Sequence, residues 1–195
     1  MSSRPEDGAL RAAAVALIGF MGAGKSAVGR HVARRLQLSF VDTDALIEQR
    51  EGPIAEIFAT RGEAAFRVIE RDIVVDTLEN GLREPCVVAL GGGAVLSGDV
   101  REALGRLSHV AWLTAPADVL WARTRRAAPG ERPLATDEQA FVRLLLERNE
   151  LYRRVATAEV LNDGSRTPAA VAEEIVTLVA GGALHPASLR EEDGR

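Results

Sequence analysis

The chain has 195 residues, the length of a single domain, and 47% of them are hydrophobic, which is enough for a packed core. Its formal net charge of −4 gives no overall attraction to nucleic acid or to an anionic membrane. Cys86 is the only cysteine, so an internal disulfide is excluded, and every apolar stretch is shorter than the roughly 18 residues that a membrane helix needs. Residues 1–11 contain acidic residues and lack the apolar region of a secretory signal. We therefore expect a cytoplasmic monomer without nucleic-acid or membrane partners.

The first predicted strand leads directly into a glycine-rich loop. Residues 14–18 form a short apolar run, and residues 19–26, GFMGAGKS, fit G-x-x-x-x-G-K-[ST] at every fixed position. A helical pattern follows, with Val28, Val32 and Leu36 on one face. Strand, loop and helix in this order predict a phosphate-binding loop, in which backbone N–H groups and the helix N-terminus bind the anion. The alternative is a glycine-rich turn without a ligand, and the complete motif in its proper context argues against it.

Two side chains of this loop can take part in the chemistry. Lys25 can reach the β- and γ-phosphates of ATP, and the Ser26 hydroxyl can ligate Mg²⁺. Lys25 is also the only lysine in the chain, since every other position with a permanent positive charge is arginine. This usage favours a specific role for Lys25, and the loop as a whole predicts ATP as co-substrate and Mg²⁺ as cofactor.

Beyond this loop, short apolar runs alternate with amphipathic segments. The further strands predicted in chain order are residues 38–41, 86–90, 110–113 and a short one ending at 160–161. The predicted helical segments are residues 45–50, 54–58, 63–82, 98–107, one opened by Pro116, 138–154 and 168–179, with breaks at Gly52-Pro53 and Arg61-Gly62. Residues 123–137 are rich in Arg, Pro, Gly and Ala without periodicity, so we expect a mobile loop there. Residues 1–13 are expected to be a disordered extension and residues 181–195 a flexible tail.

Five apolar strands that alternate with helices predict a parallel α/β sheet. Ligands of such sheets bind beyond the carboxyl ends of the strands. Residues 19–26, 42–44 and 91–93 each follow a predicted strand directly. We therefore expect these three segments to meet at one edge of the sheet and to form the site.

Asp42, Thr43 and Asp44 follow the second predicted strand. Beside a phosphate loop, one carboxylate could hold a Mg²⁺-bound water while the other takes a proton from an attacking hydroxyl. Side chains alternate along a strand end, so the two carboxylates need not share a partner. The structural alternative is that Thr43 or Asp44 caps the helix that follows.

Gly91, Gly92 and Gly93 follow the third predicted strand, and they admit two interpretations. They could form only a tight turn, or they could expose N–H groups to an anionic substrate. No aspartate follows residues 86–90, so the acidic residue that often assists Mg²⁺ at this place in P-loop proteins is missing. Asp42 is then the best candidate for that role.

These motifs occur together in a fixed order: residues 19–26, Asp42-Thr43-Asp44, Phe66-Arg67 with Glu70, residues 91–93, Arg132-Pro133-Leu134 and Arg148-x-x-Leu151-Tyr152. The set resembles that of the shikimate kinases over residues 14–180. The resemblance implies a P-loop fold like that of nucleoside monophosphate kinases, in one kinase domain at 14–180. It also implies a substrate-binding segment at about 43–70 and a lid at about 123–137. The reaction implied is ATP-dependent phosphorylation of the 3-hydroxyl of shikimate, a step toward chorismate and aromatic amino acids.

The resemblance also implies roles for individual residues. Catalysis is implied for Lys25, Asp44 and Arg132; ATP binding for Gly22, Ala23, Gly24, Lys25, Ser26, Ala27, Arg123, Arg132, Arg166 and Pro168; shikimate binding for Asp44, Arg67, Gly91, Gly92, Gly93 and Arg148; and Mg²⁺ for Ser26 and, through water, Asp42. The chemistry agrees, because a guanidinium fork matches the carboxylate of shikimate bidentately. Taken singly, Arg67 and Arg148 could equally be ordinary surface residues of helices.

The remaining polar residues point to no other chemistry. His31, His109 and His185 show no metal-ligand spacing, and we expect His109 to be partly exposed at a strand edge. Two other functions remain as alternatives. One is a small-molecule kinase of the same architecture, such as a gluconate or nucleotide kinase, and residues 42–44 with 91–93 argue against it. The other is a regulatory module that hydrolyses or senses ATP without an acceptor.

Overall fold

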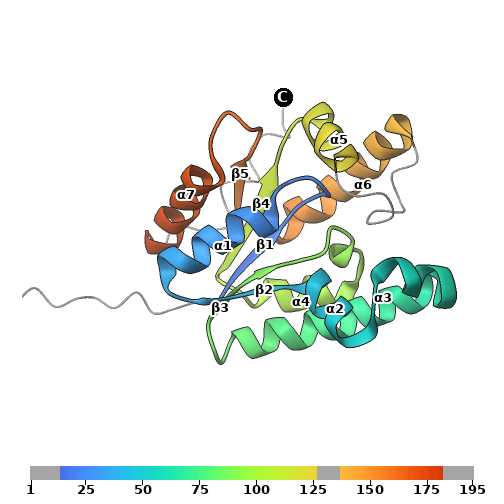
Figure 1. The fold of residues 1–195 in the computed structure, drawn as a ribbon. Helices are drawn as coiled ribbons and strands as arrows, with labels where there is room; N and C mark the ends of the chain where they lie inside the picture. The colour runs from blue at the N-terminus through green and yellow to red at the C-terminus, as the bar shows by residue number, and fades with distance from the viewer. Residues whose placement is uncertain (1–13, 127–136, 182–195) are drawn as a thin grey trace, which may run out of the picture.

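Five parallel strands form one sheet in the order β2-β3-β1-β4-β5 (Figure 1). The computed structural model describes residues 14–126 and 137–181. The strands are β1 (Val15–Ile18), β2 (Ser39–Asp42), β3 (Cys86–Ala89), β4 (His109–Thr114) and β5 (Ala158–Leu161). β1 lies in the middle, with Val15 in register with Val87 of β3 and with His109 of β4. The predicted five-stranded parallel sheet is confirmed.

Helices cover both faces of this sheet. They are α1 (Lys25–Leu36), α2 (Thr43–Glu51), α3 (Ile54–Gly81), α4 (Gly98–Gly105), α5 (Ala117–Arg125), α6 (Glu138–Val155) and α7 (Pro168–Ala180), with a 3₁₀ turn, η1 (Ala94–Leu96), before α4. The chain first crosses from the central β1 to the edge strand β2, and the later connections all run the other way across the sheet, toward β5. Because crossovers are right-handed, α1 lies on one face and α3, α4 and α6 lie on the other. The packing agrees, since α1 contacts α7 while α4 contacts both α3 and α6.

The central strand is buried along its whole length, as its apolar sequence predicts. Val15, Ala16 and Leu17 have no exposed surface, and they belong to the main core between the two helical layers. A second, smaller core lies between α2 and α3 and consists of Ile47, Ile57, Phe66 and Ile73. The segment that carries Asp44 and Arg67 is therefore held by its own apolar cluster at the edge of the sheet.

The predicted break at Arg61-Gly62 is confirmed as a kink inside α3. Gly62 has φ 79° and ψ 170°, which is far from helical geometry, and the helix resumes directly after it. Gly52, with φ 92°, ends α2 just before. Glycine accepts such positive φ angles without steric cost. The first two turns of α3 are consequently a short separate helical piece between two glycine bends.

Two expectations about local structure are wrong. The loop expected from residue 123 begins later, because α5 runs to Arg125; Thr124 faces the interior, and its hydroxyl donates to the carbonyl of Leu120 at 2.8 Å. His109, expected at an exposed strand edge, is buried, because β4 lies between β1 and β5. The sequence pattern does not show which strands lie inside the sheet, so the burial of His109 could not be predicted from it.

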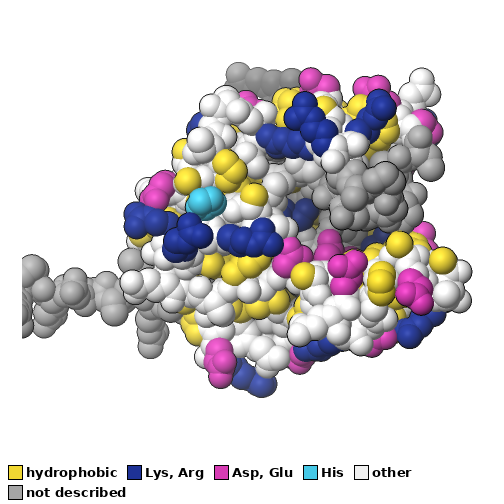
Figure 2. Space-filling model, viewed as in Figure 1, with side chains coloured by type: hydrophobic (Ala, Val, Ile, Leu, Met, Phe, Trp, Pro, Cys, Tyr) yellow, Lys and Arg dark blue, Asp and Glu magenta, His cyan; other side chains and the backbone are white. Residues whose placement is uncertain are grey.

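Charged side chains of both signs are spread over the face shown in Figure 2, with basic ones gathered over α1. Arg35 of α1 pairs with Glu173 of α7 and links these two helices. Within residues 14–126 and 137–181, no helix is both long enough and apolar enough to cross a membrane.

Candidate functional site

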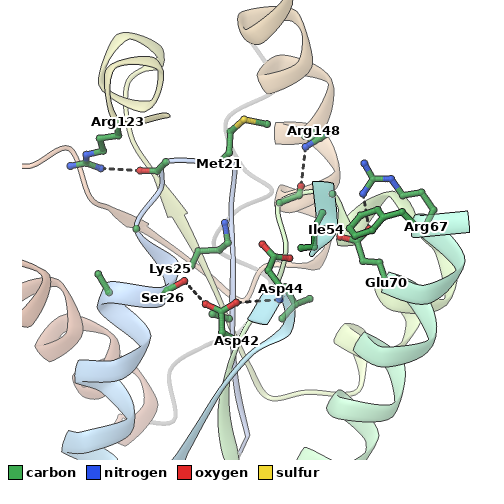
Figure 3. A pocket seen from close by; sticks show the side chains of 18 of the residues that line it. Met21, Lys25, Ser26, Asp42, Asp44, Ile54, Arg67, Glu70, Arg123 and Arg148 are labelled. Atoms are coloured by element: carbon green, nitrogen blue, oxygen red, sulfur yellow. Dashed lines mark hydrogen bonds and ion pairs between the residues drawn. The ribbon is translucent and has the colours of Figure 1, made fainter. Parts of the chain in front are cut away.

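A pocket of about 380 Å³ lies beyond the carboxyl ends of β1, β2 and β3 (Figure 3). The three segments predicted to meet do meet here, since the lining includes Lys25 and Ser26, Asp42 and Asp44, and Gly92 and Gly93. Residues from the helices close its sides: Ile54, Phe58, Phe66, Arg67 and Glu70 of α3, Arg123 of α5 and Arg148 of α6.

The glycine loop packs closely against Asn162, the residue that follows β5. Gly24 precedes α1 in the left-handed conformation, with φ 86° and ψ 19°. A Cβ at this position would lie 2.6 Å from the amide nitrogen of Asn162, which donates to the carbonyl of Ala23 at 2.8 Å. Only glycine both adopts this left-handed conformation without strain and avoids a Cβ clash with Asn162. Asn162 is buried and so holds the loop from beneath, a role that the sequence analysis did not assign.

Lys25 begins α1 and lies along the loop. Its Nζ donates to the carbonyl oxygens of Gly19 at 2.8 Å and of Phe20 at 3.1 Å. The first turn of α1 contains no acidic residue, so the positive end of the helix is not offset by its own side chains. Ammonium group and helix end therefore favour an anion at the same place.

Ser26 and Asp42 join the loop to β2. Ser26 Oγ donates to Asp42 Oδ2 at 2.5 Å, and Asp42 Oδ1 accepts from the backbone N–H groups of Asp44 and Ala45 at 3.2 and 3.4 Å. Asp42 is therefore the cap of α2, and the structural alternative, in which Thr43 or Asp44 caps this helix, is wrong. Thr43 instead is fully buried, and its Oγ1 accepts from the N–H of Gly91 at 3.0 Å, which joins the start of α2 to the glycine run.

The paired oxygens of Ser26 and Asp42 fit a magnesium ion. Mg²⁺ prefers oxygen ligands and is commonly held by one or two protein groups together with phosphates and water. Among the described residues, no group of three or more His, Cys, Asp or Glu side chains could hold a metal alone. A hydroxyl and a carboxylate beside a phosphate loop suit an ion that arrives with the nucleotide.

Two carboxylates lie close to Gly91. A Cβ on Gly91 would fall 2.5 Å from Asp44 Oδ1 and 2.8 Å from Glu70 Oε1, so a side chain at this position would displace both acids. Glu70 is 3% exposed. Burial raises the pKa of its carboxyl, the Arg67 guanidinium opposes the shift, and the charge of Asp44 adds to it.

Arg67 is held by two acidic partners. Its Nη1 donates to Glu70 at 2.6 Å and its Nη2 to Glu63 at 3.0 Å, while the guanidinium lies over the Phe66 ring at 5.3 Å. Glu70 is the inner partner and Glu63 the exposed one. Glu70 belongs to the sequence motif given above, in which it has no assigned role. The three-residue spacing from Arg67 on one helix is the signal that could have suggested the pair.

Arg148 reaches the pocket from α6 and is almost fully buried, with 4% exposure. Its Nη1 donates to the carbonyl of Gly92 at 3.2 Å, and its Nε has no hydrogen-bond partner in the described part of the chain. The guanidinium lies over the Phe20 ring at 5.2 Å. Burial lowers the pKa of Arg148, which reflects the cost of a charge removed from water. The surface alternative for this arginine is wrong.

The residues implied for the nucleotide base lie further apart. Arg123 donates to the carbonyls of Asn162 at 2.7 Å and Gly22 at 3.4 Å, so it reaches the glycine loop. Arg166 instead pairs with Glu174 and with the carbonyl of Leu161, and Pro168 is the first residue of α7; neither lines the pocket. Arg132 lies outside the described residues, as do the centre of the expected lid and both expected terminal extensions.

Comparisons with known proteins agree on one family. The sequence model described as "Shikimate kinase" matches residues 21–180. A shikimate kinase of Mycobacterium avium is 46% identical over 165 residues, which cover 83% of this chain and 90% of that protein. A solved shikimate kinase of Acinetobacter baumannii in complex with shikimate superposes with a TM-score of 0.82 at 33% identity, over 93% of this chain and all of the other. A gluconokinase of Sinorhizobium meliloti shares the fold at a TM-score of 0.57 and 21% identity, over 94% of this chain and 98% of that one.

Proposed function

Because this chain belongs to the shikimate kinase family and phosphorylates shikimate with ATP on the route to aromatic amino acids, we propose a role in that transfer for each part of the pocket. The acceptor is the 3-hydroxyl of shikimate. The observation that carries the proposal is the state of Arg148, which is buried, lines the same pocket as Lys25, and forms no salt bridge within the described residues. Glu70 attracts Arg148 electrostatically without a direct ion pair. A buried charge without a directly bonded partner of opposite charge is costly, and a substrate carboxylate would lower that cost.

Arg67 and Arg148 bind the carboxylate from two sides. They come from α3 and α6 and line one pocket, and the two guanidinium groups interact electrostatically. Arg67 is oriented by Glu70, and Arg148 by the carbonyl of Gly92. A ligand fixed by two charge-assisted contacts has a defined orientation, which in-line transfer requires. Ile54, Phe58 and Phe66 provide an apolar wall for the carbon ring.

Asp44 faces the reacting hydroxyl. In the transfer, the hydroxyl oxygen attacks the γ-phosphorus, its proton passes to the Asp44 carboxylate, and the bond to the β,γ-bridging oxygen breaks to release ADP. A positioned carboxylate of this kind contributes as a general base. Arg67 and Arg148 together form what we call the carboxylate clamp. Glu70 contacts Arg67 and is therefore a positioning residue for this clamp.

The glycine loop binds the phosphates. Backbone N–H groups of residues 22–27 and the start of α1 surround the β-phosphate, and Lys25 stabilises the charge that develops on the transferred group. Ser26, and Asp42 through water, would hold Mg²⁺, which when bound neutralises phosphate charge. Arg123 fixes the nucleotide end of the loop through its contacts with Gly22 and Asn162. By resemblance, Arg132 reaches the transferred phosphate from the lid, and Arg166 and Pro168 contact the adenine.

The remaining assignments concern organisation. Residues 43–70 form the substrate-binding segment, for which the small core between α2 and α3 supplies an anchor. Residues 123–137 form the lid by resemblance. We propose that the enzyme works as a monomer in the cytoplasm, and size-exclusion chromatography with light scattering would test the oligomeric state.

A coupled assay of ADP release tests the function directly. ADP should form rapidly with shikimate and Mg²⁺, slowly without an acceptor, and slowly with gluconate or a nucleoside monophosphate. Phosphorus NMR should show one product, the 3-phosphate, in a one-to-one ratio to ADP. Lys25→Ala is the inactive control, because it removes the ammonium group that is proposed to stabilise the transferred phosphate. Acceptor-independent ADP release would favour an ATP-hydrolysing module, and a gluconate product would favour the related sugar kinase.

A further inference from the structure

The buried face of α6 carries two polar residues. Its buried positions are Phe141, Leu145, Arg148 and Tyr152, whose spacing of four, three and four residues puts them on one side of the helix. Tyr152 has no exposed surface and is the only tyrosine in the chain. Its ring lies against Trp112 of β4, with ring centroids 5.9 Å apart. A phenylalanine would fill this space equally well, so packing alone does not explain the hydroxyl.

The hydroxyl of Tyr152 has a specific partner in the glycine run. It donates to the carbonyl oxygen of Gly92 at 2.6 Å. The same oxygen accepts from Arg148 Nη1 at 3.2 Å, so one carbonyl joins the tyrosine to the buried arginine. Burial raises the pKa of Tyr152, which keeps the phenol a neutral donor.

This arrangement fixes a peptide group at the wall of the pocket. The Gly92 carbonyl and the Gly93 N–H belong to one planar trans peptide and point in opposite directions. Holding the carbonyl toward α6 therefore also sets the direction of the Gly93 N–H. Gly92 and Gly93 both line the pocket, and the Arg67 guanidinium lies directly over Gly93. The contacts of Tyr152 thus reach both proposed carboxylate-binding arginines through one turn of backbone.

We propose that Tyr152 is a positioning residue for shikimate: its hydroxyl fixes the Gly92 carbonyl, and through it the Arg148 guanidinium and the Gly92–Gly93 peptide against which the substrate binds. The inference rests on the proposed carboxylate clamp. It concerns mainly the acceptor side of the pocket. Gly92 lies against the backbone at the start of the glycine loop, at residues 19–21, whereas the end of the loop that precedes α1 is held by Asn162.

Steady-state kinetics of Tyr152→Phe test the proposal. This variant keeps the ring and removes one hydrogen bond, so kcat/KM for shikimate should fall about tenfold while KM for ATP stays within about twofold. Thr77→Val is the matched control, because Thr77 on α3 also has a buried hydroxyl that donates to a carbonyl, that of Ile73, outside the pocket. It should leave both kinetic parameters unchanged.

The variant Arg148→Lys shows whether a failed prediction concerns the binding of the carboxylate by Arg67 and Arg148 or only the role of Tyr152. If shikimate kinetics are normal in Arg148→Lys, the carboxylate clamp itself is wrong. If Arg148→Lys is impaired while Tyr152→Phe behaves like Thr77→Val, the clamp stands and the role of Tyr152 is overturned. An equal rise in KM for ATP and for shikimate in Tyr152→Phe would also overturn it.

A spectroscopic test uses the native sequence and does not depend on a variant that folds. Because the chain has one tyrosine, 3-fluorotyrosine incorporation gives a single, assigned fluorine resonance. Saturating shikimate should shift this resonance, whereas a non-hydrolysable ATP analogue alone should leave it in place. If saturating shikimate leaves the fluorine chemical shift unchanged, Tyr152 is only part of the core.

Discussion

Ser26 and Asp42 meet where β2 ends beside α1, with Ser26 Oγ donating to Asp42 Oδ2 at 2.5 Å. The other oxygen of the same carboxylate caps α2 by accepting from the N–H groups of Asp44 and Ala45. One aspartate thus orients the hydroxyl proposed for Mg²⁺ and begins the helix that carries Asp44. The two roles have different chemical requirements, so they can be separated by mutation.

Asp42→Asn should separate capping from metal binding. Asparagine caps a helix about as well as aspartate, so thermal stability should change little. The loss of a negative charge beside Ser26 should weaken Mg²⁺ binding and raise the Mg²⁺ concentration needed for half-maximal turnover. Asp42→Ala is the comparison, because it loses the cap as well, at about 1 kcal/mol of stability. An unchanged Mg²⁺ dependence in Asp42→Asn would remove Asp42 from the metal site.

Asp44→Asn tests the general base. Asp44 does not cap α2, so the substitution leaves the cap of the helix intact. Turnover should fall by about 10²–10⁴-fold, the usual contribution of a general base, with little change in ATP affinity. Asp76→Asn on the exposed side of α3 is the matched control for the change of charge. Turnover within a few-fold of wild type would mean that Asp44 only binds the acceptor and takes no proton.

The sequence predicted the sheet, the phosphate loop and most of the pocket because these depend on local patterns. The apolar runs predict the strands, and the loop motif predicts that the segment between β1 and the start of α1 lines the pocket. What stayed hidden depends on contacts between distant segments. Asn162 meets Ala23 across 139 residues, and Tyr152 meets Gly92 across 60. Thr43 does begin α2, but the sequence does not show that its side chain also accepts a hydrogen bond from Gly91.

Which arginines are buried could not be predicted from the sequence either. Arg148 and Arg153 lie on the same helix and look equivalent in sequence, yet Arg148 is buried in the pocket and Arg153 is exposed. Helical spacing places Arg148 on the face of Leu145 and Tyr152, which is a usable signal once that face is known to be the inner one. Which face packs on the sheet is decided by topology and not by α6 itself.

Glu70→Gln tests how Arg67 is positioned. The buried Glu70 carboxylate contacts Arg67 at 2.6 Å, and an uncharged amide would hold the guanidinium less firmly. KM for shikimate should rise about tenfold, while KM for ATP should change by less than about twofold. Glu63→Gln offers a matched control, because Glu63 also contacts Arg67 but from the exposed side, where ion pairs contribute little. The positioning role fails if both variants show the same small effect.

The burial of His109 should make the free energy of unfolding depend on pH. Its imidazole is buried, its Nδ1 has no partner in the described residues, and burial lowers its pKa. The unfolded chain then binds the proton more tightly, so the contribution of His109 to stability is complete above about pH 6.5, the ordinary pKa of histidine, and is lost as the pH falls below it through the lowered pKa of the folded state. Urea unfolding across this range should show a smaller pH dependence for His109→Gln than for wild type. The half-buried His31 of α1 is the control position, and parallel pH profiles for His109→Gln and wild type would contradict the assignment.

The central claim is that Arg67 and Arg148 recognise the carboxylate of shikimate, and the most direct measurement compares shikimate with its uncharged methyl ester. Charge-assisted hydrogen bonds contribute about 1.5–3 kcal/mol each, so kcat/KM of the wild-type enzyme should favour shikimate by at least about 100-fold. Arg148→Met, which keeps an unbranched side chain but removes the guanidinium group, should lose most of this preference because its turnover of shikimate falls far more than its turnover of the ester. If Arg148→Met discriminates between the two substrates as strongly as the wild type, Arg148 does not bind the carboxylate and the account of the pocket is wrong.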